Sequence, residues 1–428
     1  MDLSSPLARI DIHTHILPSK LSTIAQKYLE LRPHADGDPR LDMFKDGKFF
    51  RTIEPNCFDI NVRLREMDEK NISMQVLSTI PVLFNYSSKN YQDVLELSRE
   101  LNNHISSICQ QHPTRFIGLG TVPLQAPRLA IDELRRCVNE LGLKGVQIGT
   151  HVNEWNLDNE ELDQFWCEVE KLDACIFIHP WEMPTGGRFD AYWMPWLCGM
   201  PFETTSAICS ILMGGVLERY PKLRLAFAHG ESIDKKFDFI VYCCFFCLGG
   251  GSFPFTVGRI DHGHECRPDL CAYKNSHLPS SYIGRFYVDS LVHDTRALKF
   301  LVEIMNENYI MLGSDCPFPL GESKPGELII KTFDNDLDTS VFWIMAMARP
   351  NNEANDFDVD HELAVEFLKR TFFHPGKTKC EEQKREASEK YEERCEPSVN
   401  KLTGSRYCPD IKTWAAFQNY EIGSGMGR

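Results

Sequence analysis

Two histidines one residue apart stand near the N-terminus, in the string IDIHTH at residues 10–15. In a β-strand, residues i and i+2 point to the same face, so His13 and His15 aim their imidazoles into one space, with Asp11 on the same side. Imidazole is a favoured ligand of zinc and related divalent ions. Alone the pattern is weak, because a polar strand end with hydrogen-bonded rings has the same sequence. It predicts a metal site only if other parts of the chain supply further ligands.

Three later residues with suitable chemistry also follow strand-like runs: His179, His229 and Asp315. Taken singly, each histidine has an ordinary interpretation as a hydrogen-bonded residue at a strand end. Asp315 alone would be a turn residue or a helix N-cap, because DCPFP is rich in turn formers. Asp289 ends another run, and we expect it to support the site rather than to bind the ion.

The strands and helices that would position these residues can also be predicted from the sequence. Strand-like runs alternate with amphipathic, helix-like stretches along the chain. The expected strands are residues 9–13, 74–78, 116–120, 146–149, 175–178, 223–228, 286–289 and 310–313, and the helices are residues 93–111, 127–140, 159–172 and 295–307. This alternation predicts an α/β fold, a parallel (β/α)8 TIM barrel, in which the active site lies at the C-terminal ends of the strands.

On one barrel rim, three histidine nitrogens and one carboxylate can surround a single divalent ion. The candidate ligands are His13, His15, His179 and Asp315. Such a set with an open position for water is typical of a catalytic site, not of a closed structural one. An ion there would lower the pKa of its water toward neutrality. His229, at the end of the sixth expected strand, is then placed to take and return protons.

Size and composition agree with an enzyme of this kind. The chain has 428 residues, of which 43% are hydrophobic and 25% charged, enough for a barrel of about 250–330 residues with additions. The net charge of −15 argues against non-specific binding to nucleic acid or to an anionic membrane. Sixteen cysteines without a secretory signal pattern predict a reduced, cytoplasmic protein.

Longer strings also match a known family. They are IDIHTHILP (10–18), KDGKFFR (45–51), GVQIGTHVNEW (145–155), HPW (179–181), YWMPW (192–196), FAHG (227–230), FPFTVGRI (253–260) and LGSDCPFP (312–319). On these strings the chain resembles the aminocarboxymuconate-semialdehyde decarboxylases of the metal-dependent amidohydrolase superfamily. The resemblance covers about residues 8–330, apart from one interruption.

The resemblance implies a Zn²⁺ ion held by the four candidate ligands, with His229 as the acid/base. It implies that Arg51 binds a substrate carboxylate, that Trp196 lines the pocket, and that Arg259 reaches the active site of a neighbouring subunit in a homodimer. From the residues alone, the two arginines would be surface residues and Trp196 would be loop packing. The implied reaction is non-hydrolytic decarboxylation of 2-amino-3-carboxymuconate 6-semialdehyde to 2-aminomuconate 6-semialdehyde, in the kynurenine pathway of tryptophan degradation.

Two segments depart from the family pattern. Residues 231–249 split the string after His229, where family members run from His-Gly-Gly-Gly directly into Phe-Pro-Phe. We hypothesise a retained intron, because both ends of the segment can be encoded by splice-site consensus sequences. We therefore expect a barrel domain over residues 8–332 with an insert at 231–249, and a divergent region over 333–428 that is partly helical or disordered. A helix at residues 360–369 is a candidate to seal the barrel.

Other interpretations share this scaffold. A related amidohydrolase-type hydrolase or an aromatic-acid decarboxylase would use the same metal site, although the Arg51 and Trp196 strings argue against both. A catalytically silent barrel is the third interpretation, because an apolar insert beside His229 could displace that residue.

Overall fold

The computed structural model describes residues 9–229 and 251–333. The predicted insert at 231–249, the candidate helix at 360–369 and nearly all of the C-terminal region lie outside these residues. The strands that form the barrel are β1 (Ile10–His15), β5 (Met74–Ser78), β6 (Phe116–Gly118), β7 (Gly145–Gly149), β10 (Cys175–His179), β11 (Arg224–Phe227), β12 (Tyr287–Asp289) and β13 (Ile310–Met311). Each begins within one residue of the start predicted from the sequence.

The barrel strands pair in parallel and close on themselves. They form two hydrogen-bonded sheets, in the orders β1-β5-β6 and β13-β12-β11-β10-β7. Single bridges join the two sheets at both edges, between Gly120 and Val146 and between Thr14 and Cys316. At the second edge the N–H of His15 donates to the Cys316 carbonyl at 2.8 Å. Every barrel strand therefore has a neighbour on each side, which is the closure predicted for a (β/α)8 barrel.

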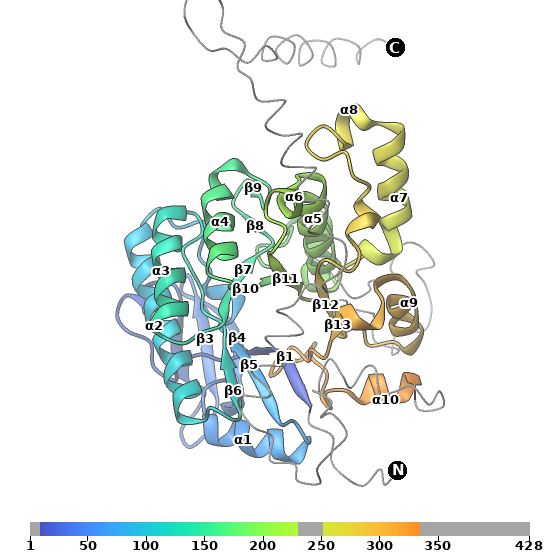
Figure 1. Ribbon diagram of the computed structural model, residues 1–428. Helices are drawn as coiled ribbons and strands as arrows, with labels where there is room; N and C mark the ends of the chain where they lie inside the picture. The colour runs from blue at the N-terminus through green and yellow to red at the C-terminus, as the bar shows by residue number, and fades with distance from the viewer. Residues whose placement is uncertain (1–8, 230–250, 334–428) are drawn as a thin grey trace, which may run out of the picture. The chain divides into compact units, whose positions relative to one another are not determined.

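Helices follow the barrel strands, and several of them lie along the outer side of the strands in Figure 1. Their bounds are α1 (Ile60–Glu69), α2 (Tyr91–Gln111), α3 (Pro127–Asn139), α4 (Asp163–Lys171), α5 (Met200–Met213), α6 (Val216–Arg219), α7 (Phe253–Cys266), α8 (Pro268–Cys271), α9 (Thr295–Met305) and α10 (Glu327–Phe333). The sequence predicted α2, α3, α4 and α9, because their apolar residues recur every three or four positions and turn one face to the strands.

The helix ends have local causes. The Asp59 side chain accepts from the N–H of Asn61 at 2.8 Å and so caps α1, and Asp294 caps α9 by accepting from the N–H of Arg296 at 2.8 Å. A side-chain acceptor at this position satisfies N–H groups that have no partner inside the helix.

Within residues 9–229 and 251–333, no helix has the length and apolar character needed to cross a membrane.

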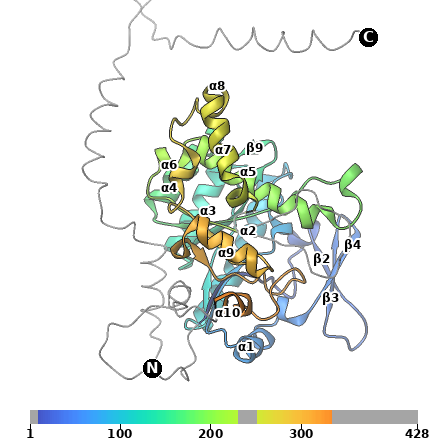
Figure 2. The same ribbon diagram turned by 90° about the vertical axis from the view of Figure 1, so that its right-hand side faces the viewer.

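A small antiparallel sheet lies outside the barrel (Figure 2). It consists of β2 (Glu30–Pro33), β3 (Leu41–Lys45) and β4 (Lys48–Ile53), in that order. Asp46 and Gly47 form the turn between β3 and β4 with φ of 52° and 70°. Positive φ at both central residues suits a tight hairpin, and Asp-Gly is a favoured pair there. A second hairpin joins β8 (His151–Val152) to β9 (Trp155–Asn156). The sequence pattern predicts neither hairpin.

Candidate metal centre

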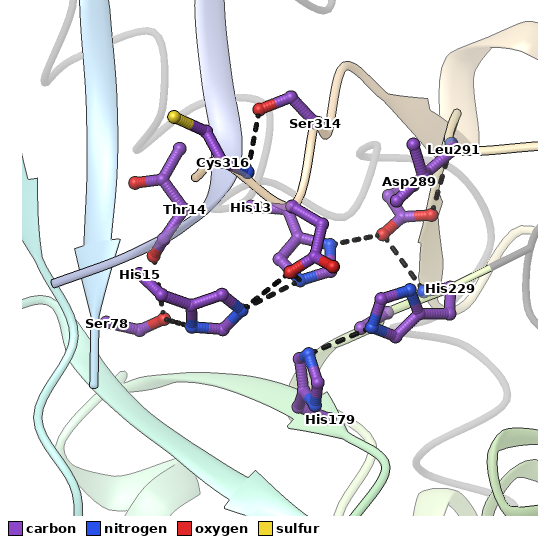
Figure 3. A network of polar contacts seen from close by, with 12 residues as sticks. His13, Thr14, His15, Ser78, His179, His229, Asp289, Leu291, Ser314 and Cys316 are labelled. Carbon is purple, nitrogen blue, oxygen red and sulfur yellow. Dashed lines mark hydrogen bonds and ion pairs between the residues drawn. The ribbon is translucent and has the colours of Figure 1, made fainter. Parts of the chain in front are cut away.

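Four side chains converge at the C-terminal rim of the barrel, and Figure 3 shows the three histidines among them. His13 and His15 come from β1, His179 ends β10, and Asp315 follows β13. Their ligand atoms all lie within 4.8 Å of one another. The Nε2 atoms of His13 and His15 are 3.2 Å apart, and Asp315 Oδ1 is 3.4 Å from the first and 3.1 Å from the second. The structure thus brings together the four residues that the sequence proposed as ligands.

The hydrogen bonds around the cluster fit the binding of a divalent ion. The Nδ1 atom of His15 contacts the Thr79 carbonyl at 2.9 Å, and that of His179 contacts the Pro180 carbonyl at 2.9 Å. A ring whose Nδ1–H donates outward presents the lone pair of Nε2 to the centre. Burial, and then neighbouring histidines, hold the pKa of His13 and His179 well below the usual range, which favours the neutral, ligating form. Three imidazole nitrogens and one carboxylate oxygen are a suitable donor set.

Asp289 lies behind the cluster and joins one of its histidines, His13, to His229. Its Oδ2 atom is 2.7 Å from Nδ1 of His13 and accepts from the backbone N–H of His229 at 3.0 Å. The other oxygen accepts from the N–H of Leu291 at 3.3 Å. Asp289 is fully buried, so these contacts replace the water that the carboxylate would otherwise bind. Asp289 therefore orients His13 and anchors the backbone of His229.

His229 sits beside the four-residue cluster. Its Nε2 atom is 3.0 Å from that of His179, and its ring centroid is 4.8 Å from that of His13. The backbone of His229 has a φ of 61°, and its carbonyl accepts from the N–H of Gly251 at 2.9 Å. Burial, with a smaller contribution from the charges of His15 and His293, lowers the pKa of His229 to about 3. A neutral imidazole thus faces the centre.

A pocket opens over the cluster and is mostly apolar. Its wall contains His15, His179 and Asp315, and outside these residues its only charged side chain among the described residues is Arg51. The other lining residues are Met43, Phe50, Ile80, Pro81, Val82, Trp181, Trp193, Trp196, Met200, Phe318, Pro319 and Leu320. A pocket of this composition suits a flat, unsaturated molecule that carries a carboxylate.

Comparisons with known proteins agree with this architecture. An amidohydrolase family model matches residues 10–341. The chain belongs to the amidohydrolase family. The 2-amino-3-carboxymuconate-6-semialdehyde decarboxylase of Dictyostelium discoideum is 50% identical over 332 residues, covering 76% of this chain and 86% of that relative. The protein of the same name from Caenorhabditis elegans is 34% identical over 420 residues, covering 84% of this chain and 96% of that relative. The resemblance noted in the sequence strings is thereby confirmed.

A solved structure shows the same fold. The dihydroxybenzoic acid decarboxylase of Polaromonas sp. JS666, solved with manganese and 2-nitroresorcinol, superposes with a TM-score of 0.56 at 20% identity, covering 85% of this chain and 96% of that chain. This likeness confirms the fold of this amidohydrolase. Because the related structure holds manganese, it does not identify the metal of this chain.

Arg51 reaches the pocket of this amidohydrolase from β4, on the sheet outside the barrel. Its guanidinium lies 5.1 Å from the centroid of Phe50 and 4.9 Å from that of Phe318, which are favourable cation–π distances. Burial lowers the pKa of Arg51, while nearby Asp315 opposes that shift. Within the part of the chain that the structure describes, Arg51 forms no ion pair, so its planar fork is available to a carboxylate.

The other two predicted substrate residues lie in different places. Trp196 lines the pocket and stacks on Trp193, with ring centroids 5.7 Å apart. Arg259 lies on α7, is exposed to solvent, and does not line the pocket of its own chain. Trp193 and Phe318 were not predicted as site residues, although both stand inside strings that match the family. Nothing in the sequence marked Thr79, whose contribution is a backbone carbonyl.

Proposed function

We propose that this amidohydrolase is a carboxy-lyase that converts 2-amino-3-carboxymuconate 6-semialdehyde to 2-aminomuconate 6-semialdehyde, in the kynurenine pathway of tryptophan degradation. The observation that carries this proposal is the position of Arg51, a guanidinium without an ion pair among the described residues, in an aromatic pocket over a cluster of three histidines and an aspartate. Two relatives that carry the name of this decarboxylase support the choice of substrate.

The four clustered residues His13, His15, His179 and Asp315 would hold one divalent ion, and we propose Zn²⁺ because it favours nitrogen-rich sets of four ligands. When bound, such an ion polarises a substrate oxygen and activates water. Metal analysis of the purified protein distinguishes Zn²⁺ from manganese, the ion in the Polaromonas structure.

The side chains of the pocket account for the rest of the chemistry. Arg51 binds one substrate carboxylate bidentately, and the stacked Trp193 and Trp196 provide a flat apolar wall for the conjugated chain. The C3–carboxyl bond breaks, CO2 leaves uncharged, and the electron pair stays in the conjugated system until a proton arrives at C3. His229 takes up a solvent proton at Nε2 and delivers it to C3, where it replaces the carboxyl group. Because the pocket lining is mostly apolar, it favours the loss of a charged carboxylate as neutral CO2.

We also propose a homodimer in which Arg259 of each subunit enters the other subunit's pocket. Arg259 is exposed and lies away from its own pocket. On the same helix Phe255 is 57% exposed, which is unusual for so large an apolar side chain and typical of an interface. Arg259→Ala should raise KM for the dicarboxylate without changing metal content, and sedimentation velocity of the wild type should give a dimer.

We place the enzyme in the cytoplasm. Cys57, Cys137 and Cys175 are buried thiols, not disulfides. Burial raises the pKa of Cys57 and Cys175 to about 12, which makes these thiols poorly reactive. A reducing compartment is consistent with a chain so rich in thiols.

A second candidate function is decarboxylation of an aromatic acid, because the aromatic lining of the pocket also suits a benzoate ring. Arg51 separates the two. Arg51→Ala removes a bidentate partner for a carboxylate that the muconate substrate retains. KM for the dicarboxylate should therefore rise on the order of a hundredfold, whereas KM for an aromatic monoacid should change little.

The deciding experiment follows the loss of absorbance of freshly generated 2-amino-3-carboxymuconate 6-semialdehyde. The full chain and a chain without residues 231–249 are assayed in parallel, with 2,6-dihydroxybenzoate as the comparison substrate. Decarboxylation of the semialdehyde by either chain supports the proposal. Metal-loaded protein that acts only on the dihydroxybenzoate would favour the second function, and metal-loaded protein that acts on neither would indicate a catalytically silent barrel.

A further inference from the structure

A buried arginine lies behind the metal centre, outside the residues assigned to the reaction. Arg63 belongs to α1 and is only 1% exposed. On the inner face of this amphipathic helix its buried companion is Met67, an ordinary apolar residue. Burying a guanidinium costs several kcal/mol unless its donors are satisfied. An arginine buried at this position therefore requires hydrogen-bond partners that offset this cost.

The donors of Arg63 are directed at main-chain and amide oxygens. Its Nε and Nη2 atoms donate to the Asn56 carbonyl at 2.9 and 2.7 Å, and Nη2 also donates to the carbonyl of His15. Its Nη1 atom donates to Oε1 of Gln75 at 3.3 Å. Among the described residues, no carboxylate lies within ion-pair distance of this guanidinium. Arg63 therefore hydrogen-bonds to the backbone of His15, a proposed metal ligand, and not to a carboxylate counter-ion.

The contact with Gln75 extends this network to two further ligands. Nε2 of Gln75 lies 3.5 Å from Oδ2 of Asp11. The Asp11 carboxylate accepts from the backbone N–H of His13 at 3.3 Å and from that of Ser314 at 3.0 Å, and it also accepts from the Ser314 hydroxyl. Ser314 immediately precedes Asp315. One connected set of hydrogen bonds thus runs from α1 to ligands on β1 and to Ser314, the residue before the ligand that follows β13.

We propose that Arg63 is a positioning residue of the metal centre. Its planar fork fixes the carbonyl of His15 directly, and through Gln75 and Asp11 it restrains His13 and the turn that carries Asp315. Partners one or two contacts away from a metal typically change its affinity 10- to 100-fold. This inference rests on the metal centre of the proposed function and not on the substrate.

The test measures metal binding by the folded chain without substrate. The metal-free wild type, Arg63→Met and Arg63→Lys are titrated with Co²⁺ against a competing chelator, well below their melting temperatures. Arg65→Met is the matched control, because Arg65 lies on the same helix but is exposed. The visible spectrum of bound Co²⁺ reports the geometry of the ligands, which a role limited to stability would not alter.

Arg63→Met should weaken Co²⁺ binding about 10- to 100-fold and shift the Co²⁺ spectrum. Arg63→Lys should fall between Arg63→Met and the wild type, because lysine keeps the charge but not the fork, and Arg65→Met should match the wild type. Affinity within twofold of the wild type and an unchanged spectrum for Arg63→Met would overturn the proposal. If the wild type itself binds no divalent ion, the proposed metal centre fails instead.

Gln75→Leu keeps the proposal testable if Arg63→Met does not fold. It leaves the contacts of Arg63 with Asn56 and His15 in place and cuts the link to Asp11. We expect Co²⁺ affinity to fall by at least about threefold. Wild-type affinity and an unchanged spectrum in Gln75→Leu would then overturn the proposal.

Discussion

Deletion of residues 231–249 is expected to leave the barrel and the metal centre intact. The carbonyl of His229 accepts from the N–H of Gly251 at 2.9 Å. The residues before and after this segment are therefore already joined by a hydrogen bond. The deletion would leave only Gly230 and Gly250 between them. That is the four-residue spacing of a β-turn, in which residue i accepts from residue i+3. Glycine at both central positions can adopt whichever sign of φ the turn requires.

The deletion should also stabilise the chain. It shortens the connection between His229 and Gly251 from 21 residues to two. The entropic cost of closing a loop grows as (3/2)RT times the logarithm of its length, so the shorter loop lowers that cost by up to about 2 kcal/mol. For a domain of this size, such a gain raises Tm by a few degrees.

Thermal unfolding of the two chains with the same metal checks this prediction, together with metal content per subunit. A chain in which residues 231–249 are replaced by a Gly-Ser sequence of equal length is the control, and it should melt like the full chain because its loop length is unchanged. A shortened chain that melts at a lower temperature, aggregates or loses its metal would refute the reasoning. Residues 231–249 would then contribute to the fold.

Three further predictions concern the site and its surroundings. His229→Asn should lower kcat by about 10²–10⁴ with metal content unchanged, because asparagine tolerates the left-handed backbone of His229 but cannot transfer the proton; steady-state kinetics with metal analysis checks this. Removal of the ion by a chelator should lower stability by about 2.7 kcal/mol relative to protein at 100 times the Kd in free ion, measured as a fall in Tm, and an unchanged Tm would contradict a metal at this site. His151 donates from Nδ1 to the carboxylate of Glu203, 3.2 Å away, and this hydrogen bond raises the pKa of His151. The pair therefore stabilises the fold fully below about pH 6.5 and loses its effect as the pH rises through the folded pKa. Stability should therefore fall less between pH 6 and 8 in Glu203→Gln than in the wild type.

The sequence predicted the barrel and its metal cluster because both follow from local patterns. A strand buried on both faces is an apolar run bounded by turn residues, and such runs were recognisable one by one. The rule that parallel barrels place their sites at strand C-termini then predicts that His13, His15, His179 and Asp315 lie together. For each of these residues, the position in the sequence relative to a strand end predicts where the side chain lies.

The remaining parts of the site depend on contacts that no local pattern encodes. Arg51 lies on a short, half-exposed sheet whose place beside the barrel is set by tertiary packing, so only the family resemblance pointed to it. Arg63 occupies an inner position of a helix where an apolar residue is expected, and by its type alone it would be assigned to the surface. Thr79 contributes only its backbone carbonyl, and a carbonyl has no residue-type signal.

The proposed metal centre can form only when the barrel closes. Two ligands stand on the first barrel strand, and Asp315 follows the last. The N–H of Ile12 donates to the Leu312 carbonyl at 2.9 Å, and Asp11 accepts from the backbone N–H of Ser314 at 3.0 Å, so β1 is held to the end of β13 beside the cluster. A one-residue slip of β1 would turn His13 away from the centre. The four ligands can therefore converge only after chain segments about 300 residues apart have paired in the correct register, and ion binding should stabilise the closed barrel as a whole.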